Sequence, residues 1–346
     1  MDETPFRLVE RLAEGERLEK DAFERLLTGE TEALRSHAAQ RAVAVRKKIY
    51  GTDVFVRGLI EISSYCRNDC LYCGIRRSNQ TAGRYRLTPD EICACADEGF
   101  ALGFRTFVLQ GGEDPFFTDN VLCEIIGRLK EKHPLCAVTL SVGERSESSC
   151  RKLFEAGADR YLLRHETANA GHYAKLHPPE MFFAHRMECL RTLRKIGFQT
   201  GAGFMVGSPW QTDGMLAEDL AFVQDFKPDM CGIGPFIPHH ATPLRGFAAG
   251  TVERTCFLLS LIRLIHPQGL LPATTALGTI DPLGREKGIL AGANVLMPNL
   301  SPVAVRKKYE LYDNKICTGE ESAQCRECLN RRMQTVGYEI VTCRGD

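Results

Sequence analysis

The stretch VFVRGLIEISSYCRNDCLYCG, residues 54–74, joins an apolar, β-branched run to a group of cysteines. Such a run predicts a buried strand over residues 54–63. The cysteines follow with the spacing Cys66-x3-Cys70-x2-Cys73, which places them on the loop after that strand. In α/β barrels the active site forms on the loops at the carboxyl ends of the strands. This stretch therefore bears on both the fold and the site.

The same alternation of strand and helix continues along the chain. Further apolar runs predict strands at 106–112, 137–143, 160–166, 199–207, 230–238, 270–277 and 294–299. Helix-length segments separate most of them, and several end in a capping glycine such as Gly103 or Gly157. Eight units in about 250 residues predict an α/β fold of the (β/α)8 TIM-barrel type, with a doubly wound open sheet as the alternative. Polar residues at the ends of nearly all strands favour the closed barrel.

The barrel divides the chain into three parts. Residues 1–50 are expected to form an N-terminal helical extension, 51–304 the barrel, and 305–346 a cysteine-bearing tail. Lys plus Arg equals Asp plus Glu at 44 each, so no basic field indicates nucleic acid. No apolar run approaches a membrane span, and the amphipathic start lacks the apolar region of a signal peptide. We expect a cytoplasmic protein with neither nucleic acid nor membrane as a partner.

The cysteine content points to thiols or metal ligation. The chain has 15 cysteines, and without a secretion signal we expect thiols or metal ligands rather than disulfides. One group is the triad already named, and a second is Cys317, Cys325 and Cys328. The remaining cysteines are scattered through helical or strand patterns, where we expect small buried hydrophobes.

The first triad predicts an iron–sulfur cluster. Three thiolates can hold three irons of a [4Fe–4S] cube and leave the fourth without a protein ligand. That iron can chelate S-adenosylmethionine (SAM), and one electron then breaks a C–S bond to give methionine and a 5′-deoxyadenosyl radical. A zinc site is the alternative, but zinc normally takes four ligands and no fourth candidate stands nearby. Tyr72, next to Cys73, also fits the radical SAM pattern and can lie against the nucleoside.

The ends of later strands predict contacts to SAM. Gln110, Gly111 and Gly112 close the second strand, where glycines let the backbone approach a ligand closely. Ser141 ends the third strand and offers a hydroxyl group to the same cavity. Ile237 lies in a Pro-rich loop suited to an adenine.

The fourth strand carries charged residues on one face. In RYLLRHET, the alternation of a strand puts Arg160, Arg164 and Glu166 on the same side. Charges that face the interior of a barrel are costly unless they meet charged ligands or each other. We expect them to meet SAM and an anionic substrate; pairing with one another is the alternative.

Longer strings resemble the HydE family, the radical SAM maturases of [FeFe]-hydrogenase. They run along nearly the whole chain as VLQGGEDP, GADRYLLRHETAN, TGAGFMVGSP, GIGPFIPH, PATTALGT and GANVLMPN, followed by YELYDNKIC and CREC. The resemblance implies a (β/α)8 barrel whose cavity holds SAM and substrate, and a role in assembling the diiron subcluster of the hydrogenase. It also implies an Fe(CO)2(CN)–cysteine synthon from the companion maturase HydG as substrate, the scaffold HydF as acceptor, and a reducing electron donor. The adenosyl radical is expected to attack the synthon at its cysteinyl sulfur.

Site residues follow from the resemblance position by position. Glu166 would contact the SAM ribose, and Ser141 and Arg186 the SAM carboxylate. Arg160 and Arg164 would anchor anionic groups of the substrate. The far part of the cavity would be lined by Thr274, Thr275, Tyr309 and Tyr312. One position departs from the family pattern G-x-P-G-Q-T: here GSPWQT carries Trp210, which puts the conformation of that loop in doubt.

The second triad resembles an accessory iron–sulfur site of many HydE proteins. Cys317, Cys325 and Cys328 would hold a [2Fe–2S] or [4Fe–4S] cluster that the reaction does not require. A zinc staple or reduced thiols are the alternatives. For the whole chain, the rival functions are a methylornithine synthase-like or biotin synthase-like radical SAM enzyme, and a non-catalytic iron–sulfur carrier.

Overall fold

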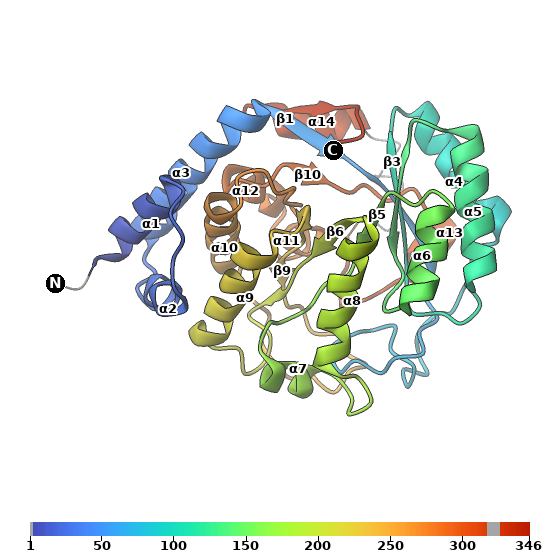
Figure 1. Cartoon of the computed structure of the whole chain (residues 1–346), viewed down its shortest axis with the longest axis horizontal. Coiled ribbons are helices and arrows are strands. Elements are labelled where there is room, and N and C mark those ends of the chain that lie inside the picture. Colours follow the sequence, from blue (N-terminus) through green and yellow to red (C-terminus); the bar gives the residue numbers. More distant parts are fainter. Residues whose placement is uncertain (1–2, 317–325) are drawn as a thin grey trace.

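The computed structural model describes residues 3–316 and 326–346 of the chain. Parallel strands form its centre, and helices cover them on the outside (Figure 1). The strands are β1 (Asp53–Val56), β2 (Gly58–Ser63), β3 (Thr106–Gly111), β4 (Ala137–Ser141), β5 (Arg160–Leu162), β6 (Gln199–Ala202), β7 (Met205–Val206), β8 (Met230–Cys231), β9 (Gly234–Pro235), β10 (Val295–Leu296) and β11 (Glu339–Val341).

Within the described residues, three helices precede the first strand, and most of the later helices connect one strand to the next. The helices are α1 (Pro5–Ala13), α2 (Lys20–Thr28), α3 (Glu32–Tyr50), α4 (Pro89–Ala101), α5 (Asp119–Lys132), α6 (Glu147–Glu155), α7 (Ala170–Leu176), α8 (Phe183–Ile196), α9 (Asp213–Phe226), α10 (Val252–Ile265), α11 (Thr275–Ile280), α12 (Gly284–Leu290), α13 (Val303–Arg306) and α14 (Arg326–Gln334). Local sequence explains several starts. Thr88 and Glu91 form a capping box before α4, with Pro89 as the first helical residue.

The strands close into a ring. The main sheet has the parallel order β2-β3-β4-β5-β6-β8, and β1 pairs with β10. Isolated parallel bridges close the remaining gaps: Leu59–Asn299, Met230–Leu270 and Pro272–Val295. This closure confirms the predicted (β/α)8 type of fold. Apolar residues from both faces of the strands are fully buried in the core, such as Ile60 and Leu140 on one face and Val108 on the other.

The seventh predicted strand, 270–277, is wrong in its length. It contributes only the bridges at Leu270 and Pro272, and the chain enters α11 at Thr275. Proline lacks the N–H that a strand ladder needs, so Pro272 limits the pairing. Thr274 already has the extended backbone of a helix N-cap residue.

The fifth predicted strand, 199–207, is divided into β6 and β7. The break falls at Gly203, whose φ is 155°. A Cβ atom there would stand 2.0 Å from the carbonyl oxygen of Gly232. Only glycine fits this close approach between neighbouring strands.

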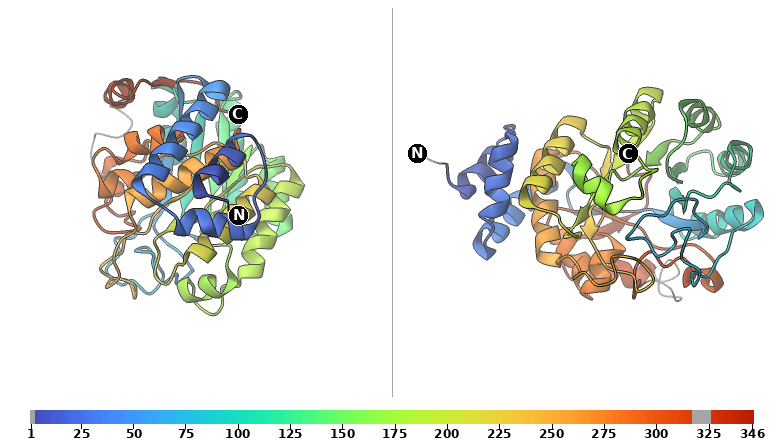
Figure 2. Two further views of the ribbon diagram at one scale, coloured as in Figure 1. Left: turned by 90° about the vertical axis from the view of Figure 1, so that its left-hand side faces the viewer. Right: turned by 90° about the horizontal axis from the view of Figure 1, so that it is seen from below.

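Helices α1–α3 lie outside the ring as a layer against α9 and α10 (Figure 2). The chain end returns to the ring next to the end of α3, where Arg46 lies over the ring of Tyr338: β11 pairs in parallel with β1 at residues Asp53–Phe55, a strand that the sequence did not predict. Residues after β11 then reach the amino-terminal end of the barrel, here called the floor. The other end, where the cysteine loop lies, is called the mouth. None of the helices among the described residues is long and apolar enough to cross a membrane.

Candidate SAM and iron–sulfur site

The cysteine loop follows β2 at the mouth of the barrel. Arg84 fixes its path, because its guanidinium donates to the carbonyl oxygens of Ser64, Ile75, Arg76 and Asn79. Gly112 at the end of β3 packs directly on the loop: a Cβ atom there would be 2.2 Å from the oxygen of Tyr65 and 2.7 Å from Cβ of Cys66. The glycine that sequence analysis assigned to a ligand contact thus allows β3 to approach the cysteine loop.

The three cysteines fit a cluster with an open iron. Cys66, Cys70 and Cys73 are free, half-buried thiols on this single loop. Burial raises the pKa of each thiol, to about 12 for Cys73, and the charges of the neighbouring thiols raise those of Cys70 and Cys73 further. As thiolates the three side chains would repel one another, and the iron ions of a cluster would offset that repulsion.

Tyr72 lies between the cysteines and α7. Its hydroxyl is 3.2 Å from Nε2 of His177, and Nδ1 of His177 is 2.9 Å from the Tyr173 carbonyl oxygen. Since Nδ1 can only donate to that oxygen, Nε2 accepts from the tyrosine. Burial lowers the pKa of His177 to about 3, so the ring is neutral. Sequence reasoning missed His177 and Tyr173, which no motif marks.

Arg164 and Glu166 lie just beyond β5 and face each other. Nη2 of Arg164 is 3.3 Å from Oε2 of Glu166. In spite of that proximity, Nε and Nη2 of Arg164 and Oε2 of Glu166 are buried and have no hydrogen-bond partner among the described residues. Glu166 also has a φ of 67°, an uncommon conformation for a residue with a side chain. Buried orphan atoms and backbone strain together indicate a place prepared for a ligand.

Arg186 approaches the same region from α8. Its Nε donates to Glu144 at 2.5 Å, and its Nη1 donates to the Arg164 carbonyl oxygen at 2.6 Å. The guanidinium is buried and thereby ties α8 to the loop that carries Glu166. Ser141 ends β4 and pairs in register with Gln110 of β3, so both lie at the mouth.

The opposite wall is formed by residues from β9 onward. Tyr309 is buried and its hydroxyl is 3.4 Å from Nε2 of Gln110. Oγ1 of Thr274 is buried and lacks a hydrogen-bond partner within the described part of the chain. Thr275, Ile237 and Tyr312 are half-buried. The structure therefore brings Gln110 and Tyr309 into contact.

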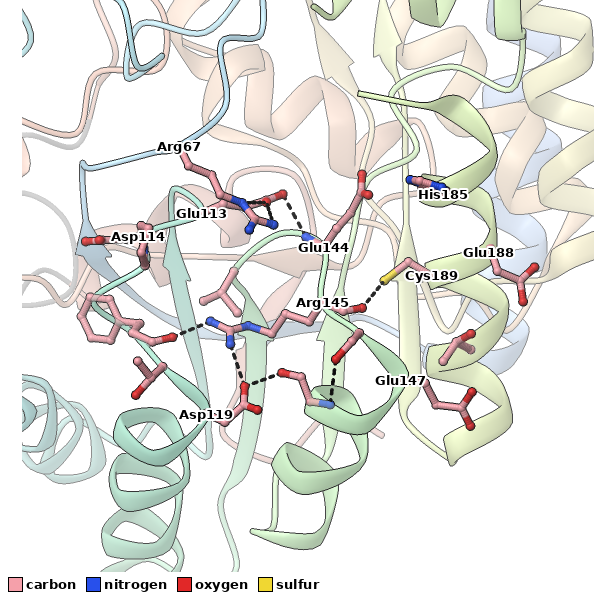
Figure 3. A pocket seen from close by; sticks show the side chains of 17 residues that line it. Arg67, Glu113, Asp114, Asp119, Glu144, Arg145, Glu147, His185, Glu188 and Cys189 are labelled. Carbon is pink, nitrogen blue, oxygen red and sulfur yellow. Dashed lines mark hydrogen bonds and ion pairs between the residues drawn. The ribbon is translucent and has the colours of Figure 1, made fainter. Parts of the chain in front are cut away.

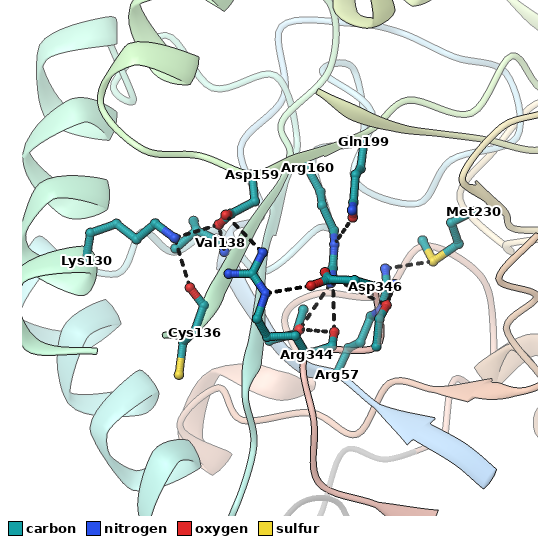
Figure 4. Close-up of polar contacts among 12 residues, drawn as sticks. Arg57, Lys130, Cys136, Val138, Asp159, Arg160, Gln199, Met230, Arg344 and Asp346 are labelled. Carbon is teal, nitrogen blue, oxygen red and sulfur yellow. Dashed lines mark hydrogen bonds and ion pairs between the residues drawn. The ribbon is translucent and has the colours of Figure 1, made fainter. Parts of the chain in front are cut away.

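Arg160 does not lie at the mouth, and the expectation that it shares a cavity with Arg164 is wrong. Its guanidinium is saturated at the floor (Figure 4). It donates to Gln199 at 2.5 Å, to Thr106 at 3.1 Å and to the Arg344 carbonyl oxygen at 3.0 Å, and it pairs with Asp346. The alternation along a strand determines which face a side chain lies on, but it does not determine how far along the barrel axis that side chain lies. Arg160 starts β5 and therefore lies at the amino-terminal end of the barrel.

A surface hollow of about 800 Å³ lies beside the mouth. Figure 3 shows its charged lining, in which Arg67 contacts Glu113 and Glu113 accepts the backbone N–H of Glu144. It is open to solvent and shares Glu144 with the Arg186 contact. The hollow is an outer surface feature, distinct from the orphan atoms of Arg164 and Glu166.

A group of two histidines and an aspartate resembles a metal site but is not suited to bind a metal ion. His239, His240 and Asp313 lie close enough to share a metal ion. However, Nδ1 of His239 accepts the N–H of Ala241, which leaves the proton on Nε2, the atom that faces Asp313. That nitrogen has no lone pair for a metal.

In the second triad, Cys317 and Cys325 lie outside the described residues. Cys328 is exposed on α14, is disulfide-bonded rather than a thiol ready to bind a metal, and accepts a hydrogen bond from Arg331 at 3.5 Å.

Comparisons with known proteins agree with this geometry. Residues 60–223 match the radical SAM superfamily. The [FeFe] hydrogenase maturase subunit HydE of Thermotoga maritima is 43% identical over 93% of each chain. The 3-methylornithine synthase of Methanosarcina barkeri is 28% identical over 96% of this chain and 93% of its own.

Solved structures show the same fold. A methylornithine synthase structure superposes with a TM-score of 0.80 at 26% identity, covering 96% of this chain and 97% of its own. A structure of HydG, a maturase of the [FeFe]-hydrogenase, has a TM-score of 0.81 at 19% identity over 98% of this chain and 76% of its own.

Proposed function

Because the chain belongs to the HydE family of radical SAM enzymes, we propose that it acts in maturation of [FeFe]-hydrogenase on an Fe(CO)2(CN)–cysteine complex supplied by HydG. Membership of the radical SAM superfamily implies a [4Fe–4S] cluster and SAM. The single observation that carries the proposal is the ion pair of Arg164 and Glu166, whose buried Nε, Nη2 and Oε2 atoms make no hydrogen bond, at the mouth that also holds the cysteine triad.

The cluster would be held by Cys66, Cys70 and Cys73. With SAM bound, it supplies a 5′-deoxyadenosyl radical on reduction by one electron. The protein's own residues bind SAM and orient it. Oε2 of Glu166, which makes no hydrogen bond, can accept from ribose hydroxyls, and the family resemblance assigns Arg186 and Ser141 to the SAM carboxylate.

Further SAM contacts are assigned to residues around this carboxylate. Gln110, Gly111 and Gly112 close β3 next to the cysteine loop, Tyr72 lies within the triad, and Ile237 follows β9. The amide nitrogen of Gln110 donates a hydrogen bond to the hydroxyl of Tyr309. The amide oxygen of Gln110 can therefore accept a hydrogen bond from the methionine amino group of SAM.

The substrate would lie deeper, between Arg164 and the wall of β9 and α11. Arg164 has two nitrogens that make no hydrogen bond, one of which is in an ion pair with Glu166, and such a fork suits the two oxygens of a cysteine carboxylate. The unpartnered Oγ1 of Thr274 can donate to an anionic group. Thr275, Tyr309 and Tyr312 would complete the lining. Arg160 is not part of this proposal, since its bonds are saturated at the floor.

The remaining roles follow from the family. We propose that an electron donor reduces the cluster, that the product passes to the scaffold HydF, and that the second triad holds an accessory cluster. The likeness to methylornithine synthase favours a second candidate, a rearrangement of an amino acid, because that enzyme has the same fold along 96% of this chain. Arg164 could bind an amino-acid carboxylate equally well.

The test is maturation of apo-hydrogenase in a reconstituted mixture with HydG and HydF. We expect activation with this protein and none when it is omitted or replaced by Cys70→Ser. Activation that does not depend on this protein would contradict the proposal. Consumption of lysine with formation of methylornithine would instead support the second candidate.

A further inference from the structure

A buried ion pair joins β2 to the segment that follows the barrel. Glu61 lies on β2, ahead of the cysteine loop, and its side chain is 1% exposed. It pairs with Nζ of Lys315, whose side chain is 9% exposed. The other carboxylate oxygen accepts from Nδ2 of Asn299 at 2.9 Å. A charge inside an apolar strand persists only with partners of this kind.

Lys315 also holds the backbone of Tyr309. Its Nζ donates to the Tyr309 carbonyl oxygen at 2.9 Å and lies 4.8 Å from the centre of the Tyr309 ring. The hydroxyl of this same tyrosine is 3.4 Å from Gln110 at the end of β3. A continuous chain of contacts thus runs from Glu61 through Lys315 and Tyr309 to Gln110.

We propose that Glu61 and Lys315 are positioning residues of the SAM site, which hold Tyr309 against Gln110 and so orient the Gln110 amide. The inference rests on the proposed function in one respect, the assignment of Gln110 to SAM. Lys315 lies beyond the barrel and just before the second cysteine group. The tail would therefore complete the SAM site through Lys315 rather than through its cysteines.

A matched pair at the floor separates positioning from plain stabilisation. Nζ of Lys130 contacts Asp159 at 2.8 Å and donates to the Cys136 carbonyl oxygen at 3.0 Å (Figure 4). The chemistry is the same as at Lys315, an ion pair plus a backbone carbonyl. However, no residue of the mouth takes part in the Lys130 contacts.

The experiment measures two quantities: the Kd for SAM of the reconstituted, oxidised protein by titration, which should rise with the KM, and 5′-deoxyadenosine formation by the reduced protein at varied SAM concentration. Lys315→Met should raise the KM for SAM about five-fold, the effect of losing one hydrogen-bonded contact, while kcat changes little. Tyr309→Phe should have the same effect, and the double variant should be no worse than either single variant, because both act through one contact chain. Lys315→Arg keeps the charge and should restore much of the affinity.

Lys130→Met should lower the unfolding temperature but leave the KM for SAM unchanged. An unchanged KM in folded Lys315→Met, or additive effects with Tyr309→Phe, would overturn the proposal. If Lys315→Met does not fold, Glu61→Gln/Lys315→Met removes both charges at once and avoids an unpaired buried carboxylate. A raised KM in that variant supports the proposal, and a wild-type KM overturns it. SAM cleavage is measured without hydrogenase, so failure of the maturation role would leave this test valid.

Discussion

Arg160 and Arg164 stand four positions apart in RYLLRHET and meet opposite surroundings. Arg160 is saturated at the floor by Gln199, Thr106 and the chain end. Arg164 is half-buried at the mouth, forms an ion pair with Glu166, and keeps two nitrogens without a hydrogen bond to the residues that the structure describes. Because a buried polar group is costly when unpaired, a protein retains one mainly where a ligand will pair it. The floor is built for stability, and the mouth is built for a ligand.

The largest effect is expected at the cysteine loop. Cys70→Ser should abolish formation of 5′-deoxyadenosine from SAM with dithionite, because a cube held by two thiolates does not supply the electron. Cys93→Ser, a half-buried thiol on α4, is the control and should retain activity. Continued cleavage by Cys70→Ser would show that the triad has been assigned to the wrong role.

The second prediction concerns the arginine at the mouth. Arg164→Lys keeps the charge but loses the two-pronged donor, so hydrogenase activation should fall about ten-fold or more. SAM affinity, measured by titration, should stay near wild type, since Glu166 and Arg186 are unchanged. Wild-type activation would mean that Arg164 is only a structural partner of Glu166.

The same substitution at the floor should act on stability. Arg160→Lys loses several hydrogen bonds to Gln199, Thr106 and the chain end, and the free energy of unfolding should fall by about 1–3 kcal/mol. Activation per folded molecule should not change. Urea unfolding and the maturation assay together check this. A loss of activation at full stability would place Arg160 in the substrate site after all.

The next effect is on pH dependence. His177 has a folded pKa of about 3 through burial, against about 6.5 when unfolded, so only the unfolded state gains a proton between these values. Its contribution to stability is therefore present above pH 6.5 and is lost as the pH falls. Between pH 6.5 and 5.5 the wild type should lose about 1 kcal/mol more than His177→Gln. Parallel stability curves for the two proteins would indicate that His177 is protonated in the fold.

The smallest effect is expected in the tail. Cys325→Ser/Cys328→Ser should lower the iron content and leave SAM cleavage largely unchanged, because the triad at the mouth supplies the reaction. Iron analysis and the 5′-deoxyadenosine assay measure the two quantities. Loss of cleavage with the fold intact would show that a tail cluster relays electrons.

Sequence reasoning was sufficient where local pattern decides the structure. The alternation of apolar runs and helices gave the barrel, and the position of the triad directly after a strand gave the mouth. It was insufficient where distant segments meet. The partners of Arg160 are the chain end and two other strands. Hydrophobic periodicity reports local structure and cannot show contacts between segments so far apart in the sequence. Lys315 and His177 were missed for the same reason.

Glu61 could have been found, because a glutamate within the apolar run VFVRGLIEIS has to be buried and must find a partner. Trp210 is a second instructive position. The sequence put the conformation of its loop in doubt. The structure shows Trp210 with a φ of 64°, in the left-handed region that glycine adopts without steric cost. The tryptophan thus keeps a glycine-like backbone while its ring packs against Phe247 at 5.0 Å.

Hydrogen exchange with and without SAM tests the division between mouth and floor most directly. In the anaerobically reconstituted protein, SAM should slow exchange in the segments that end β3 and β4 and in residues 164–168, which carry the orphaned atoms. Exchange in 156–160 and in 339–346, at the floor, should not change. Protection at the floor, or none at the mouth under saturating SAM, would contradict the account.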